Sequence, residues 1–169
     1  MDDITEYRLY TFGNFYLSSI QQGIQAAHAL GELFLKYNRG AQDGTTEKLH
    51  LINWAEDHKT MICKNGGAEA ELLELIRVFN TDKNPYPWSF FEEEQAALNG
   101  ACTCVAIVVP DTIYDRGIKL YKAFQKGTAQ YHYNNDEGIH MYTCVGKSYI
   151  YSDFEFELIE QIRNSRNAI

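Results

Sequence analysis

The sequence predicts an α/β fold: a domain of three-layer type with a mixed, partly parallel sheet of about four strands flanked by helices, plus a C-terminal antiparallel meander and helix. Three observations lead to this prediction. Over the first 124 residues, short aromatic or β-branched runs alternate with helical apolar periodicity. Residues 102–110, CTCVAIVVP, are almost continuously apolar, as in a strand covered on both faces. Residues 129–152 contain three alternating runs separated by turn signals.

A first strand over residues 7–12, YRLYTF, precedes a long helix that begins near Ser19. Ser19 and Gln22 have the spacing of a capping box, and the helical pattern continues to about residue 37. This helix has small residues at every fourth position, where another element can approach closely: Gly23, Ala27 and Gly31. We therefore expect the small residues to pack on the sheet.

Four more elements follow a polar, glycine-containing loop over residues 38–46. They are a short helix over 47–57, a strand over 59–63, a helix over 66–80, and an edge-like strand over 88–93 that follows two prolines. The 66–80 helix has glutamates near its positive N-terminal end. The two helices are expected to turn these apolar residues inward: Leu49, Ile52, Trp54, Leu72, Leu73, Ile76 and Phe79.

The central strand over 102–110 and a helix over 112–125 complete the α/β pattern. Turns at 135–138 and 146–147 then separate the strands of the meander, and Ser152 with Glu155 caps a last helix. We divide the chain into an α/β domain over 1–124 and a meander with its helix over 125–169, packed together as one structural unit.

Composition suits a soluble globular protein of 169 residues, with 45% hydrophobic and 22% charged residues. No apolar run reaches the roughly 18 residues of a membrane span, and the acidic N-terminus does not resemble a signal peptide. We expect a cytoplasmic protein with no membrane partner. The four cysteines lack metal or disulfide spacing, so Cys102 and Cys104 are interpreted as buried packing thiols, with a metal or redox pair as the alternative.

The net charge of −8 is concentrated early in the chain. Residues 1–110 have 8 Lys/Arg against 15 Asp/Glu, giving −7, whereas residues 111–169 have 7 against 8, giving −1. Proteins that bind long nucleic acids use many cations to neutralise phosphates. A long nucleic acid is therefore not an expected partner.

Common catalytic motifs are absent, including the P-loop, GxGxxG, GxSxG and HExxH. His132 and His140 are expected to face each other across a hairpin, where Cys144 could complete a metal site. A packed cross-strand pair is the other interpretation, and we expect neither a metal nor a cofactor. The run Glu92 to Glu94 is either a solvated loop or helix start, or supplies one carboxylate to a cleft.

Two groups of side chains are candidates for ligand binding. Gln21, Gln25 and His28 form a polar stripe on the first helix, which is either a solvated face or one wall of a site. Tyr131, Tyr142 and the other tyrosines of the meander place several rings on one face. Such a face either packs on the protein or a second copy, or stacks on a ligand.

Three stretches resemble one known family. Gln25, His28 and Ala29 follow the first strand; Trp54 precedes KTMIC and an acidic, leucine-rich helix; and GACTCVAIVVP contains Gly100, Thr103 and Pro110. Residues 7–124 thereby resemble the peptidyl-tRNA hydrolases of the archaeal and eukaryotic type. The resemblance implies an α/β scaffold and cleavage of the ester of peptidyl-tRNA.

The chain departs from the family at two positions that matter for catalysis. Gln21 stands where the family has a lysine, and the family's aspartate after the third strand has no match, with Glu92 the nearest carboxylate. We therefore expect a non-catalytic binding protein, of an accessory or phage-borne kind, that holds a small polar or nucleotide-like ligand or a protein partner. Its expected ligand-binding residues are Gln21, Gln25, His28, Thr103, Tyr131 and Tyr142.

The alternative is an active hydrolase of the peptidyl-tRNA type. In that case His28 and Glu92 are the candidate catalytic residues and compensate for the missing groups. Homo-oligomerisation is left open by the sequence.

Overall fold

The computed structural model describes residues 5–39 and 44–168, so part of the predicted 38–46 loop, residues 40–43, lies outside the described residues. The chain forms two compact units, Met1–Pro110 with Ser165–Ile169, and Asp111–Asn164. The helix predicted over 112–125 is grouped with the meander, so the division falls after residue 110 rather than after residue 124. The α/β class predicted from the sequence is confirmed.

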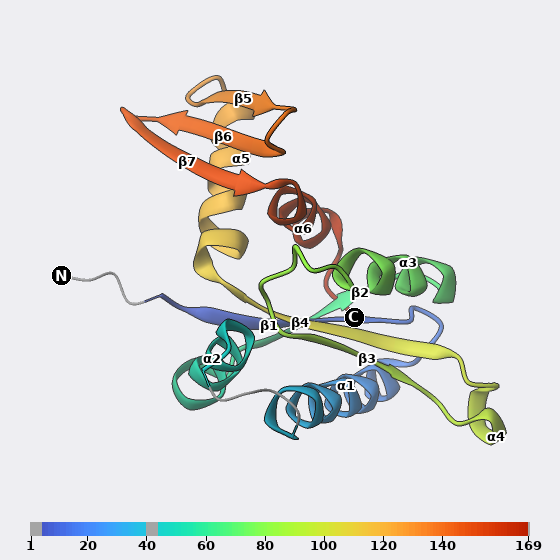
Figure 1. Ribbon diagram of the computed structural model, residues 1–169. Coiled ribbons are helices and arrows are strands. Elements are labelled where there is room, and N and C mark those ends of the chain that lie inside the picture. Colours follow the sequence, from blue (N-terminus) through green and yellow to red (C-terminus); the bar gives the residue numbers. More distant parts are fainter. Residues whose placement is uncertain (1–4, 40–43, 169) are drawn as a thin grey trace. The chain divides into compact units, whose positions relative to one another are not determined.

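The first unit contains a four-stranded mixed sheet in the order β2-β1-β4-β3 (Figure 1). Strands β1 and β2 are parallel, whereas β4 is antiparallel to both of its neighbours. The strands are β1 (Tyr7–Gly13), β2 (Met61–Asn65), β3 (Trp88–Glu92) and β4 (Cys102–Pro110). As predicted, β4 is central and buried along its whole length, and β3 lies at an edge.

Helices cover both faces of this sheet (Figure 1). Helices α1 (Ser19–Arg39) and α2 (Thr46–Asn53) lie on one face, and α3 (Glu69–Phe79) lies on the other. A π-helical turn, η1 (Trp54–His58), extends α2, and a single helical turn, α4 (Gln95–Leu98), follows the glutamate run. The core on the α1 face joins Ala29, Leu33, Leu51 and Trp54 to Ala106 of β4.

Helix α1 differs from its prediction in two respects. The cap is Ser18 rather than Ser19, because the Ser18 N–H donates to Oε1 of Gln21 while the Gln21 N–H donates to Oγ of Ser18. The small-residue stripe is solvent-exposed, and a Cβ placed on Gly23 would meet no atom within 4 Å. The packing prediction for that stripe was therefore wrong. The residues that pack on the sheet are Ala26, Ala29 and Leu33.

One leucine predicted to face inward on each of α2 and α3 lies at the surface instead, whereas Leu72 of α3 is buried as predicted. Leu49 is 52% exposed while Leu51 is buried, and Leu73 is 47% exposed while Leu75 is buried. Both helices exist as predicted, with Trp54 and Phe79 inward. Because each residue advances a helix by about 100°, two leucines that are two positions apart lie on nearly opposite faces, so one is buried and the other exposed.

The second unit combines a three-stranded antiparallel meander with two helices. Its elements are the π-helical η2 (Thr112–Gly117), α5 (Ile118–Gln125), β5 (Gln130–Asn134), β6 (Ile139–Cys144), β7 (Lys147–Ser152) and α6 (Asp153–Asn164). The predicted turn at 135–138 and the capping box of Ser152 with Glu155 are confirmed, whereas the turn predicted at 146–147 lies one residue earlier, at Val145 and Gly146.

Gly117 lies where η2 meets α6. A Cβ at this glycine would lie 2.8 Å from Cγ1 of Ile159, so only a residue without a side chain fits this approach. The glycine that interrupts the apolar pattern of 112–125 is therefore a packing site for α6.

Helices that could span a membrane were not found among the residues that the structure describes.

Candidate functional site

Gln25 differs from its two neighbours on the polar stripe of α1, because it is buried, whereas Gln21 and His28 are exposed. Both ends of its side-chain amide are paired. Oε1 accepts a hydrogen bond from Oγ1 of Thr103 at 3.0 Å, and Nε2 donates to Oε1 of Glu93 at 2.6 Å. Gln25 thus ties α1 to β4 and to the end of β3.

A β-bulge places Thr103 in this cluster. Phe91 pairs with Cys104 and Glu92 pairs with Cys102, so Thr103 has no register partner on β3, although its Oγ1 donates a hydrogen bond to the Phe91 carbonyl at 3.4 Å. An extra residue in one strand breaks the alternation of side chains between the two faces. Thr103 can therefore reach Gln25 on α1, on the side of the sheet where Cys104 also packs.

The other two polar residues of the stripe have separate environments. Oε1 of Gln21 accepts from both the N–H and the hydroxyl of Ser18, so its side chain caps the helix. The His28 ring stacks on Phe91, with ring centroids 4.5 Å apart and an interplanar angle of 14°. No hydrogen bond between His28 and Glu92 occurs in the described residues. The structure therefore brings Gln25 and Thr103 together and leaves Gln21 and His28 outside their cluster.

Glu92 lies instead in a groove of about 380 Å³ beside the free edge of β3. The groove is lined by Glu32, Lys36, Ser89, Phe90, Phe91 and Glu92. Nζ of Lys36 donates to the Trp88 carbonyl at 3.0 Å, and burial lowers the pKa of this lysine. Oγ of Ser89 donates to the Ala29 carbonyl at 2.6 Å. These two polar groups therefore bind the protein's own backbone.

Tyr131 and Tyr142 belong to the second unit, where the meander places them opposite each other on β5 and β6. Tyr142 is only 2% exposed, and burial raises its pKa to about 12. Its ring packs against Tyr131 and against Phe124 of α5. The prediction that several tyrosines share one face is confirmed, and this face packs on the unit's own helices.

His140 forms the centre of a partly buried hydrogen-bonded network on the same face. Its Nδ1 lies 2.7 Å from the Tyr131 hydroxyl, and its Nε2 lies 2.8 Å from Oδ1 of Asp153. The ring also stacks on Phe156, with centroids 3.9 Å apart. The network joins β5, β6 and α6, and each polar atom of the imidazole has a partner.

The predicted pairing of His132 with His140 was wrong. The hairpin register places His132 opposite Met141 and Tyr133 opposite His140, so the two histidines lie on opposite faces of the meander. Within residues 5–39 and 44–168, no three His, Cys, Asp or Glu side chains gather as metal ligands would. Cys102 and Cys104 are buried free thiols, and burial raises the pKa of Cys102 to about 12.

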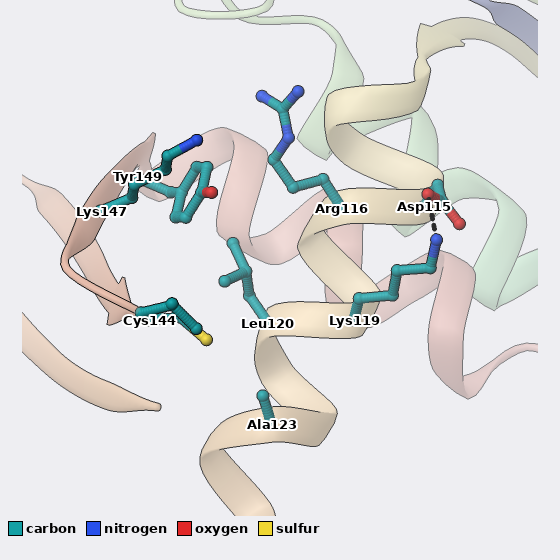
Figure 2. A pocket seen from close by; sticks show the side chains of 9 residues that line it. Asp115, Arg116, Lys119, Leu120, Ala123, Cys144, Lys147 and Tyr149 are labelled. Atoms are coloured by element: carbon teal, nitrogen blue, oxygen red, sulfur yellow. Dashed lines mark hydrogen bonds and ion pairs between the residues drawn. The ribbon is translucent and has the colours of Figure 1, made fainter. Parts of the chain in front are cut away.

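A concave site lies in the second unit, between the helical segment of η2 and α5 and the hairpin of β6 and β7. Its volume is about 540 Å³ (Figure 2). The helical wall comprises Asp115, Arg116, Lys119, Leu120 and Ala123. The hairpin wall comprises Cys144, Val145, Lys147 and Tyr149.

Local sequence explains how each wall of this pocket forms. Arg116, Lys119 and Ala123 recur at helical spacing and lie on one face, as Figure 2 shows. The hairpin turns through Val145 and Gly146, with φ angles of 49° and 72°. Two positive φ angles are typical of the tight turns that match the twist of a hairpin. Val145 is an unusual residue there, because a β-branched side chain is strained at positive φ, and it is 94% exposed.

The charges around this pocket are mainly positive. Nζ of Lys119 pairs with Oδ2 of Asp115 at 2.7 Å (dashed in Figure 2). The Arg116 guanidinium lies 5.6 Å from the centroid of the Tyr149 ring. In the described part of the chain, neither Arg116 nor Lys147 has a carboxylate at ion-pair distance. The pocket therefore has two cations without a counter-charge.

Sequence reasoning missed this pocket, although the basic residues of α5 and the tight turn were visible in the sequence. Neither signal indicates a site until the helix and the hairpin are brought together. No protein-family model matches the chain, and a search of curated proteins found no significant match.

Proposed function

We propose that this protein is a non-catalytic binding protein that holds a small ligand in the pocket between α5 and the β6–β7 hairpin. One observation carries the proposal: the pocket of about 540 Å³ has the volume of a small-molecule site. It combines apolar residues, Leu120 and Ala123, with a few polar groups. Such a combination is typical of ligand pockets.

The hydrogen bonds of Gln21 and Gln25 on the α1 stripe support binding rather than catalysis. Gln21 caps its own helix, and Gln25 is held by Thr103 and Glu93. A catalytic acid or base needs a side chain that can reach the proton it moves. Residues that hold the fold together in this way are not free to take that role.

Filling the pocket tests the proposal. Ala123→Trp places a large ring against the hairpin wall, and Lys122→Trp places the same ring on α5 at an exposed residue outside the pocket. A small-molecule library is screened by thermal shift. A ligand at 100 times its Kd stabilises the folded state by about 2.7 kcal/mol.

We expect compounds that stabilise the wild type and Lys122→Trp but not Ala123→Trp. Equal stabilisation of all three proteins would place the ligand elsewhere and contradict the proposal. A library with no stabilising compound would contradict it as well, and would favour a protein partner.

The second candidate function is hydrolysis of peptidyl-tRNA. Its support is the meeting of Gln25, Thr103 and Glu93 near the family-like helix, with His28 one turn further along α1. The test is incubation of charged peptidyl-tRNA with the wild type, His28→Ala and Glu92→Gln. Cleavage by the wild type that either substitution abolishes would overturn the non-catalytic proposal.

A further inference from the structure

We infer that the pocket between α5 and the β6–β7 hairpin selects an organic anion with a flat apolar ring, whose negative group lies between Arg116 and Lys147. The inference rests on the proposed function and names the chemical class of its ligand. It combines the charge of the pocket lining, the pairing of those charges and the apolar surface beside them.

The charge of the lining is opposite to that of the whole protein. The chain has a formal net charge of −8, yet its pocket has three cationic side chains and one carboxylate. That carboxylate, Asp115, is already paired with Lys119. Two positive charges therefore remain for a ligand to neutralise.

Desolvation decides the sign of the ligand's charge. Arg116 and Lys147 are exposed in the empty pocket, so a ligand that fills it takes part of their water, and a charged group that loses water without gaining a counter-charge is destabilised. A neutral or cationic occupant would incur this cost at both residues. An anion forms charge-assisted hydrogen bonds with them instead.

Geometry places the anion between the two walls of the pocket. Arg116 extends from the helix and Lys147 from the hairpin, where it lies beside the Tyr149 ring in Figure 2. The Arg116 guanidinium lies 5.6 Å from the centroid of that ring. Because Arg116 lies on η2 and Lys147 on β7, one bound anion would bridge η2 and the hairpin. A guanidinium also offers paired donors that match a carboxylate, sulfonate or phosphate.

The remaining lining explains why the ligand also needs an apolar part. Leu120 and Ala123 of α5 face Val145 and Tyr149 of the hairpin. A small inorganic anion would leave this surface in water. A flat ring would cover it and stack on Tyr149, which is worth roughly 1 kcal/mol beyond area burial for an aromatic pair.

A pair of fluorescent probes with matched rings tests the inference. 1-Anilinonaphthalene-8-sulfonate has a ring system and one negative charge, and N-phenyl-1-naphthylamine has the same rings without the charge. Both are titrated into the wild type, Arg116→Gln, Lys147→Gln and Ala123→Trp. Lys122→Gln removes a cation from the same helix outside the pocket and is the matched control.

We expect the sulfonate to bind at least tenfold more tightly than the neutral probe, a difference of about 1.4 kcal/mol. Arg116→Gln and Lys147→Gln should each weaken sulfonate binding about tenfold or more, as expected for a charge-assisted hydrogen bond. Lys122→Gln should leave it unchanged. Because the cations lie at the surface, added salt should weaken sulfonate binding as well.

The outcomes separate the two proposals. If both probes bind equally and Ala123→Trp abolishes both, the pocket binds ligands but does not select anions, so this inference fails and the proposed function stands. If neither probe binds, or if Ala123→Trp changes nothing, the pocket is not a ligand site and both fail. Sulfonate binding that is insensitive to Arg116→Gln and Lys147→Gln also overturns the inference.

Discussion

At the scale of single residues, Gln25 shows how one polar side chain on a helix can hold three elements together through hydrogen bonds. Its partners lie 68 and 78 residues away along the chain, yet the three side chains meet in a cluster that is largely closed to water. A buried polar atom that loses its partner is still removed from water but no longer has a hydrogen bond, so the folded state is destabilised.

Gln25→Leu should therefore destabilise the first unit by roughly 1–3 kcal/mol, because it leaves Thr103 and Glu93 without their shared partner. Urea unfolding followed by tryptophan fluorescence measures this unit selectively, since Trp54 and Trp88 both lie in it. Gln21→Ala is the matched control on the same helix.

Gln21→Ala should cost less than about 1 kcal/mol, because its hydrogen bonds to Ser18 are exposed to water. A Gln25→Leu protein as stable as the wild type would contradict the structural role of Gln25 and would return this residue to the list of ligand contacts.

At the scale of elements, the β6–β7 hairpin combines a regular register with a strained turn. All six residue pairs from Ile139 with Ser152 to Cys144 with Lys147 are in register, so the turn has only two residues, Val145 and Gly146. An L residue in the left-handed region loses roughly 1–2 kcal/mol, and a β-branched residue is among the least suited to it. Asparagine tolerates this conformation far better.

Val145→Asn should consequently stabilise the hairpin by about 0.5–1 kcal/mol. Hydrogen exchange of the amides in residues 139–152, measured by mass spectrometry, should slow accordingly. Val145→Ala should give a smaller gain, because alanine retains a Cβ at positive φ. Faster exchange in Val145→Asn would show that the turn is not strained.

At the scale of the whole molecule, the first unit buries neutral cysteine thiols and the second buries neutral tyrosine hydroxyls. Burial raises the pKa of Cys102 in the first unit and of Tyr142 in the second, each to about 12, and it also raises the pKa of Cys104 and Tyr151. In the unfolded chain these groups ionise near their ordinary pKa, about 8.5 for cysteine and 10 for tyrosine.

The consequence is a loss of stability in alkaline solution. A raised folded-state pKa contributes stability fully below the unfolded pKa, and this contribution is lost as the pH rises through the folded pKa. The free energy of unfolding should therefore be level between about pH 7 and 8, then decline from about pH 9 towards pH 12.

Tyr142→Phe removes one of the ionising groups, so its decline above about pH 10 should be shallower than that of the wild type. Urea unfolding at several pH values, followed by far-ultraviolet circular dichroism, measures the slope. Identical slopes for the two proteins would mean that the Tyr142 hydroxyl ionises equally easily in the folded and unfolded states.

The sequence by itself determined the order and type of most elements. Local periodicity and turn residues were enough to predict the central strand over 102–110, the edge strand beside the prolines and the three strands of the meander. The reason is physical: a strand pattern repeats every two residues and a helical pattern about every 3.6, so each is recorded in a short stretch of chain.

Only the tertiary structure decided which side chains meet. The rotation of α2 and α3 about their axes leaves Leu49 and Leu73 at the surface. A bulge brings Thr103 to Gln25. The hairpin register pairs His132 with Met141, one residue away from His140, so the two histidines lie on opposite faces. The pocket likewise exists only because α5 packs beside the β6–β7 hairpin. Each outcome depends on rotations and shifts of a single residue between elements distant in sequence, and local patterns do not encode those shifts.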